Sequence, residues 1–311
     1  MIINTGCRTD IPAYYSKWFF NRIREGYVLV RNPYREDQVI KYRLTPDVVD
    51  VICFCTKNPE PMLENLHLLS PFRQFWFVTI TPYGKDVEPN VPEQDRVINS
   101  VKKLSERVGA RAVSWRYDPI FINNKYSVDF HIQKFTEMAE ELKNYVNSCV
   151  VSFIDLYFKT KRNFPGVREV SPVQQEEIIR AFASIGRENG LKVRTCCENP
   201  SLEKFGVDVS GCMTQSVIEE ATGCSLNVPK AKQAPRAQCS CLLGCDIGMY
   251  NTCGHGCIYC YANYDMQTVA KNMACHYPDS PLLIGRLRPG DKITEARQIS
   301  YIDDQINIFE I

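Results

Sequence analysis

The sequence predicts an α/β protein built on a partial (β/α) TIM-like barrel of parallel strands. Two observations predict this fold. Short apolar, β-branched runs alternate with helical periods through the first two hundred residues, which is typical of a parallel sheet. The length of 311 residues also suits one barrel with an appendage. A chain of this size buries about three quarters of its unfolded surface, so it needs no metal or disulfide simply to fold.

The predicted barrel strands are residues 1–4, 48–54, 75–81, 111–115, 150–156 and 191–195. Two further runs, on either side of "NPYRED", predict a hairpin near residues 27–43 that is inserted into the first crossover. The regular alternation ends near residue 200. We therefore assign residues 1–225 to the barrel portion and 226–311 to a cysteine-rich region, with a basic, proline-bearing linker at 228–238.

Capping signals between these runs predict where the helices begin and end. Asp10 and Ser127 have side chains that cap helices, and Ser171 with Gln174 reads as a capping box. A glycine after a helical period predicts its stop. The predicted stops are Gly26, Gly109 and Gly190.

Charge and hydropathy exclude some classes of protein. Lys and Arg number 37 against 36 Asp and Glu, and a net charge of +1 argues against strong electrostatic capture of nucleic acid or acidic membranes. No apolar run approaches the ~18 residues of a membrane span, and "MIINTGCRTD" lacks a signal-peptide pattern. We expect a soluble, cytoplasmic protein with no membrane partner.

Most of the 15 cysteines follow residue 195. In a reducing compartment such clustering indicates metal or cluster binding rather than disulfides. The alternative is that these thiols are small buried apolar groups. That alternative suits Cys53 and Cys149, which lie in apolar runs, but not thiols beside glycines and polar residues.

The densest group is "CGHGCIYCYAN", in which Cys253, Cys257 and Cys260 lie within eight residues. Three thiolates on a short loop hold three corners of one compact centre and leave a position open for a small molecule, as catalytic metal sites do. Ligation by thiolates alone suits zinc or an iron–sulfur cluster. Gly254 and Gly256 permit the backbone turns that wrapping a centre needs.

The Cys-x3-Cys-x2-Cys spacing, with Tyr259 just before the last cysteine, resembles the signature of radical S-adenosylmethionine (radical SAM) enzymes. "CIYCYAN" is similar to the spore photoproduct lyase branch. The segment "CFCTKNP" and the stretch from "TITPYG" to "SWRYDPI" resemble later strands of that branch's barrel. The whole chain further resembles a bacterial family of unknown function that has a radical SAM-type cysteine cluster at its C-terminus.

This resemblance implies that Cys253, Cys257 and Cys260 bind a 4Fe-4S cluster whose fourth iron is chelated by S-adenosylmethionine. One electron from a reducing partner such as flavodoxin or ferredoxin would cleave the sulfonium and release a 5′-deoxyadenosyl radical. That radical would abstract hydrogen from a substrate. The substrate is left open among a small molecule, a nucleotide and a peptide.

The motif is displaced, because the radical SAM family places it after the first strand and here it begins at residue 253. We predict a circular permutation, in which residues 246–250 are the family's first strand and pair beside residues 1–4. The cysteine-rich region would then complete the barrel. The alternative is a small cluster domain appended to an unrelated barrel.

The resemblance also predicts residues that contact the cofactor. The loop "NTGCRTD" would take the place of the family's glycine-rich S-adenosylmethionine contact, with Thr5, Gly6 and Cys7 as candidates. Tyr259 and Glu198 complete the predicted cofactor-binding set.

The carboxyl-terminal ends of the predicted strands are polar and charged, and function gathers there in a parallel barrel. We take Lys57, Arg116 and Asp118 as catalytic candidates, because Arg116 can bind a carboxylate with its planar fork and Lys57 can bind the same ligand. The alternative is a salt bridge between these residues at the barrel rim.

A second thiol set is predicted from the remaining cysteines. Four ligands close a site, and we expect Cys197, Cys212, Cys239 and Cys241 to hold an auxiliary 4Fe-4S cluster or a structural zinc ion. Cys196 and Cys197 would point to opposite faces of a strand end, so one of them serves. Unligated thiols are the remaining alternative.

Two other classes of function compete with a radical SAM enzyme. One is a non-catalytic iron–sulfur protein for electron transfer or sensing. The other is a zinc-stabilised interaction module on a barrel. The open three-thiol site favours the enzyme, because an electron carrier normally has four protein ligands.

Overall fold

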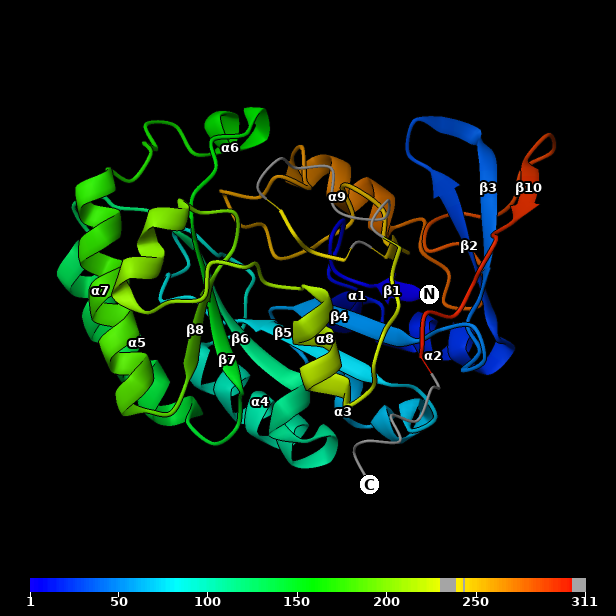
Figure 1. Ribbon diagram of the computed structural model, residues 1–311. Coiled ribbons are helices and arrows are strands. Elements are labelled where there is room, and N and C mark those ends of the chain that lie inside the picture. The colour runs from blue at the N-terminus through cyan, green and yellow to red at the C-terminus, as the bar shows by residue number, and fades with distance from the viewer. Residues whose placement is uncertain (230–238, 243, 304–311) are drawn as a thin grey trace, which may run out of the picture.

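The structure, a computed structural model, describes residues 1–229, 239–242 and 244–303 (Figure 1). Its centre is a seven-stranded parallel sheet with the strand order β8-β7-β6-β5-β4-β1-β9. The strands are β1 (Ile2–Asn4), β4 (Val51–Thr56), β5 (Gln74–Thr79), β6 (Val113–Ile120), β7 (Ser148–Phe153), β8 (Lys192–Thr195) and β9 (Cys245–Asp246). The parallel α/β class predicted from the sequence is confirmed. Most of the predicted linker, from residue 230, lies outside the described residues.

Helices connect neighbouring strands and cover both faces of the sheet. They are α1 (Ile11–Tyr14), α2 (Ser16–Glu25), α3 (Glu60–Leu63), α4 (Gln94–Val108), α5 (Val128–Leu142), α6 (Phe158–Asn163), α7 (Pro172–Glu188), α8 (Gln215–Thr222) and α9 (Met266–Met273). Short 3-10 turns are η1 (Leu66–Leu69), η2 (Ala110–Ala112) and η3 (Pro200–Phe205). Within the described residues no helix has the length and apolar character needed to cross a membrane.

Alternate residues of each strand point to opposite faces of the sheet and build two separate cores. On one face Ile52 and Phe54 of β4 pack with residues of α2, α4, α5 and α7. On the other face, called here the inner face, Val51 and Cys53 pack with Val217 and Ile218 of α8. The inner face is therefore closed by α8 over part of the sheet, and Figure 1 shows α8 against the strands.

The capping signals are confirmed, with one break that the sequence did not indicate. Asp10 accepts a hydrogen bond from Ala13 N at 3.0 Å, and Ser171 with Gln174 forms the capping box of α7. The single helix expected between Asp10 and Gly26 is two helices. Tyr15 leaves the helical conformation, with φ −131°, and its buried hydroxyl donates to Thr252 O at 2.6 Å.

The hairpin expected near residues 27–43 is present and belongs to a second sheet. β2 (Tyr27–Asn32) pairs antiparallel with β3 (Arg35–Arg43), and β10 (Lys292–Glu295) adds to β3 in parallel. Figure 1 shows this small sheet standing beside the main one. The third strand, from the far end of the sequence, was not predicted.

The predicted pairing of a late segment beside the first strand is also present, over fewer residues. Ile3 is in register with Cys245 and Asn4 with Asp246, and both strands run in parallel. Ile247 N still donates to Asn4 O at 3.0 Å, and beyond it Gly248 N donates to the Asp246 carboxylate at 2.9 Å. β9 is therefore two residues long and overlaps only the start of the expected 246–250 strand.

The fold generates a pH prediction at His131 of α5, which is buried and bonded to Tyr117 Oη at 2.8 Å and Phe121 O at 3.0 Å. Burial lowers the pKa of His131 from 6.5 to about 4, so its contribution to stability is complete above pH 6.5 and is lost as the pH falls towards 4. Between pH 7.5 and pH 5 we expect this residue to cost the wild type about 2 kcal/mol of unfolding free energy, measured by urea titration.

His131→Gln should show a correspondingly weaker acid dependence, because the variant has no group to protonate. His67→Gln, at an exposed position, is the control and should follow the wild type. Equal pH slopes for the wild type and H131Q would contradict this assignment.

Candidate functional site

The cysteine loop, residues 253–260, follows β9 and lies over the carboxyl-terminal ends of three strands. The loop after β5 holds it through two backbone bonds, Asn90 N to His255 O at 3.1 Å and Ile258 N to Val87 O at 3.0 Å. Residues that follow β1 and β4 contact it as well, as described below. The three thiols are therefore gathered at the edge of the sheet where parallel α/β proteins place their sites.

The two glycines of the loop are needed for different reasons. Gly256 has φ +71°, a left-handed conformation that favours glycine. Gly254 lies against the ring of Tyr14, and a Cβ at this position would stand 2.7 Å from Tyr14 Cε1. The turn expected at Gly256 is confirmed, whereas Gly254 allows close packing rather than an unusual backbone angle.

The Asp10 carboxylate joins the cysteine loop to the sheet. Its Oδ1 caps α1, and its Oδ2 accepts Lys57 N at 2.8 Å and lies 2.8 Å from His255 Nε2. The other ring nitrogen of His255 lies 3.2 Å from Tyr14 Oη. His255 is thus buried, and both of its ring nitrogens are engaged by these contacts rather than offered to a metal ion.

The three thiols are half-buried and act on one another electrostatically. Burial, and after it the charge of Asp10, raises the pKa of Cys253 well above its ordinary value. Burial also raises the pKa of Cys257, while the nearby Lys57 ammonium acts in the opposite direction. Cys260 Sγ accepts a hydrogen bond from Ala262 N at 3.3 Å. A cation bound between these sulfurs would stabilise their thiolate forms.

Lys57 and Glu88 form a buried ion pair next to Cys257. Lys57 Nζ lies 2.9 Å from Glu88 Oε1, which also accepts from Thr81 Oγ1 at 2.6 Å and from the hydroxyl of Tyr259. Burial alone would lower the pKa of Lys57, but Glu88 raises it, and Lys57 likewise lowers the pKa of Glu88 against the effect of burial. Both groups are therefore charged at neutral pH.

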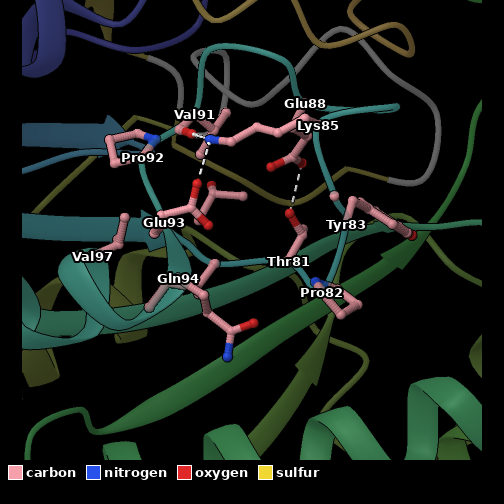
Figure 2. A pocket seen from close by; sticks show the side chains of 13 residues that line it. Thr81, Pro82, Tyr83, Lys85, Glu88, Val91, Pro92, Glu93, Gln94 and Val97 are labelled. Carbon is pink, nitrogen blue, oxygen red and sulfur yellow. Dashed lines mark hydrogen bonds and ion pairs between the residues drawn. The ribbon is translucent and has the colours of Figure 1, made fainter.

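Glu88 was missed from the sequence. It is an acidic residue in a proline-rich loop directly after a strand, and this position at the carboxyl-terminal edge was the available signal. A pocket of about 210 Å³ adjoins it, between this loop and the start of α4. Figure 2 shows Thr81 and Glu88 pointing towards each other at one side, while Lys85 reaches Val91 and Glu93 at the other.

The other two catalytic candidates bind each other. Arg116 Nη2 lies 2.5 Å from Asp118 Oδ2, and Ser152 Oγ also donates to this carboxylate. Arg116 and Asp118 thus form the salt bridge of the alternative, Lys57 pairs with Glu88, and the catalytic roles of the three stay predictions. Arg116 Nη1 also lies 3.8 Å from Cys212 Sγ, so it faces the second set of thiols.

The predicted cofactor loop lies along the ends of β4 and β9. Thr5 is buried, and its backbone N–H donates to Cys53 O at 3.1 Å. A Cβ on Gly6 would stand 2.2 Å from Cys55 O, so only glycine fits this approach. Cys7 is exposed, and its N–H donates to Asp246 at 2.8 Å. Glu198, the last of the set, accepts Phe153 N at 2.8 Å beyond β7.

A second group of thiols lies on the inner face, and we call it the inner thiol group. It comprises Cys196, Cys197, Cys212 and Cys241. Three of these were predicted. Cys239 was predicted as the fourth member, and the structure has Cys196 in its place. Cys239 packs against the same apolar core, but no described contact joins its sulfur to the group. Across the described residues, no set of three or more His, Cys, Asp or Glu side chains is arranged to hold a metal ion as it stands.

The contacts of Asp10 generate a stability prediction. Asp10→Ala should lower the free energy of unfolding by about 3 kcal/mol, because it removes a helix cap and leaves the buried N–H of Lys57 without its acceptor. Asp265→Ala is the matched control, since Asp265 caps α9 by accepting a hydrogen bond from Thr268 N, and it should cost about 1 kcal/mol. Urea denaturation measures both. If both variants lost the same free energy of unfolding, Asp10 would contribute no more to stability than a helix cap does.

Comparison with known proteins assigns the chain at the family level. No curated protein matches the sequence. The family model described as "Domain of unknown function (DUF1848)" matches residues 2–262, a range that includes the cysteine loop, Asp10, Lys57 and Glu88. This agrees with the resemblance to a family of unknown function. The chain therefore belongs to the DUF1848 family.

Proposed function

We propose that this protein is a radical SAM-type enzyme in which Cys253, Cys257 and Cys260 hold a 4Fe-4S cluster. One observation carries the proposal. The cysteine loop follows a strand that pairs in parallel beside β1, and it lies over the carboxyl-terminal ends of the sheet. This is the strand-then-cysteine-loop order of the radical SAM family, moved to the end of the sequence. We infer from it a circularly permuted partial barrel.

The residues present fit such a cluster. The donor set is three thiols on one loop, and thiolates are the ligands that iron–sulfur clusters prefer. His255 lies in the same loop but is bound to Asp10 and Tyr14 through its two ring nitrogens. The loop itself therefore supplies three ligands, which leaves one position for an exogenous group.

When bound, such a cluster supplies one-electron cleavage of S-adenosylmethionine and thus a radical for hydrogen abstraction. The surrounding side chains prepare the site for it. Lys57 places a positive charge near Cys257, which favours the thiolate form of that ligand. Glu88 fixes both Lys57 and Tyr259 by accepting their hydrogen bonds. Lys57 and Glu88 have little exposed surface, which limits the access of water to the base of the loop.

We assign the S-adenosylmethionine contact to the loop of Thr5, Gly6 and Cys7, which lies between β9 and the end of β4. Free thiols and an iron–sulfur site suit a reducing compartment, and we propose that the enzyme acts in the cytoplasm. A flavodoxin or ferredoxin is the proposed electron donor. The substrate class stays open among small molecules, nucleotides and peptides.

The proposal predicts the outcome of anaerobic purification. The wild type should contain iron and sulfide, and with dithionite it should convert S-adenosylmethionine to 5′-deoxyadenosine. Changing Cys253, Cys257 and Cys260 together to alanine should reduce product formation to background, because the cluster loses all its protein ligands. Cys275→Ala is the control, since Cys275 is an exposed thiol just beyond α9, and this variant should keep full activity.

Other results would select another function. An iron-containing protein that never cleaves S-adenosylmethionine would support the electron-transfer or sensor alternative. A colourless protein that contains only zinc would support the interaction module.

A further inference from the structure

The inner thiol group brings together three segments that are far apart in the sequence. Cys196 and Cys197 follow β8, Cys212 lies before α8, and Cys241 lies in the segment that leads to β9. Cys196 Sγ is 3.4 Å from Cys212 Sγ, and Cys212 Sγ is 3.3 Å from Cys241 Sγ. The side chain of Cys197 hydrogen-bonds that of Cys196. Direct sulfur contacts therefore connect Cys196, Cys212 and Cys241, and Cys197 adjoins them through Cys196.

The backbone at Cys197 explains how neighbouring cysteines serve the same group. An extended chain would turn Cys196 and Cys197 to opposite faces. Cys197 instead has φ +59°, in the left-handed region that non-glycine residues rarely adopt. Such conformations carry a cost and persist where the surroundings require them. Because Cys197 is not extended, strand alternation does not force the two thiols to opposite sides of the strand end.

Hydrogen-bond donors also point at these sulfurs. Arg116 Nη1 lies 3.8 Å from Cys212 Sγ, and Met213 N donates to Cys241 Sγ at 3.3 Å. Donors aimed at sulfur, and a half-buried guanidinium beside it, stabilise negative charge on thiolate ligands. Neutral thiols that only fill apolar space need neither.

We propose that Cys196, Cys197, Cys212 and Cys241 bind one tetrahedral divalent ion, zinc, as a closed structural site. Thiolates about 2.3 Å from zinc stand about 3.8 Å apart at tetrahedral corners. The two sulfur pairs at 3.4 Å and 3.3 Å therefore need to open by only a few tenths of an ångström. A 4Fe-4S cluster lies between its cysteine ligands, so the ligand sulfurs must be much farther apart. The sulfur contacts thus favour the zinc alternative for the second thiol set over an auxiliary cluster.

This site goes beyond the proposed function and does not depend on it. With four protein ligands the ion has no position for substrate, so its role is structural. It would fasten the end of β8, the start of α8 and the segment before β9 to one another on the inner face. Through Cys241, the ion would hold in place the start of the segment that leads through β9 to the cysteine loop.

Cobalt binding tests the proposal directly. The full chain with Cys253, Cys257 and Cys260 changed to alanine keeps the inner thiol group and loses the thiols of the cysteine loop. It is titrated anaerobically with Co²⁺ alone. We expect one cobalt per chain, with the charge-transfer absorption of a tetrahedral thiolate site. Cys212→Ser in this background should abolish that absorption, whereas Cys224→Ser, a thiol just after α8 outside the group, should not.

Absence of the tetrathiolate spectrum would overturn the proposal, and so would iron and sulfide retained by the triple-alanine chain. Either result leaves the proposed function to be judged by 5′-deoxyadenosine formation in the wild type.

A second measurement needs no variant and so does not depend on how a variant folds. The zinc-loaded wild type is alkylated with a maleimide before and after treatment with a strong zinc chelator, and labelling is read by peptide mass spectrometry. We expect the four thiols of the group to label at least tenfold faster after chelation. Cys7 and Cys275, which are exposed, should label in both samples. Equal labelling of the four thiols with and without zinc would refute the site.

Discussion

Two residue pairs between β1 and β9 connect opposite ends of the sequence, and the arrangement of the cysteine loop depends on them. The strands approach so closely that a Cβ on Gly244 would stand 2.2 Å from Ile2 O. So short a pairing needs support from side chains. Asp246 provides it by accepting bonds from Cys7 N at 2.8 Å and from Arg8 Nε at 3.0 Å. These contacts set the direction in which the chain leaves the sheet towards Cys253.

Beyond this pairing, the carboxyl-terminal edge is organised by alternating charges. Lys57 interacts with Glu88, Cys257 and Asp118, and Arg116 interacts with Asp118 and with Cys212. A cation thus stands beside each of the two thiol sets, and carboxylates hold both cations in place. Buried charges are tolerated only when they are paired in this way. The two sets of sulfurs are in consequence electrostatically connected through one row of residues.

Local signals in the sequence were sufficient for much of this fold. Ser171 with Gln174, and Asp10, define helix starts through bonds to residues only three positions away, and such bonds can be read from spacing. Long-range partners could not be read in the same way. Glu88 binds Lys57 across 31 positions, and nothing in the sequence couples them. The sequence therefore indicated Lys57 but not the acid that keeps it charged.

The second thiol set shows the same limit at the level of the backbone. The prediction that only one of Cys196 and Cys197 serves assumed an extended chain. Cys197 has a left-handed backbone conformation, so that assumption does not hold. The break between α1 and α2 has a similar origin, because the bond from Tyr15 to Thr252 lies outside any local pattern. Residue types were thus predictable, whereas their grouping required the three-dimensional contacts.

The order of the strands also has a consequence for biosynthesis. β1 leaves the ribosome first, yet its neighbour on one side, β9, is translated only after the rest of the sheet. At roughly 5–20 residues per second this delay is on the order of tens of seconds. Throughout that time the outer edge of β1 presents free backbone groups that other chains can bind. Synthesis of β9 is therefore the step that closes this edge of the sheet.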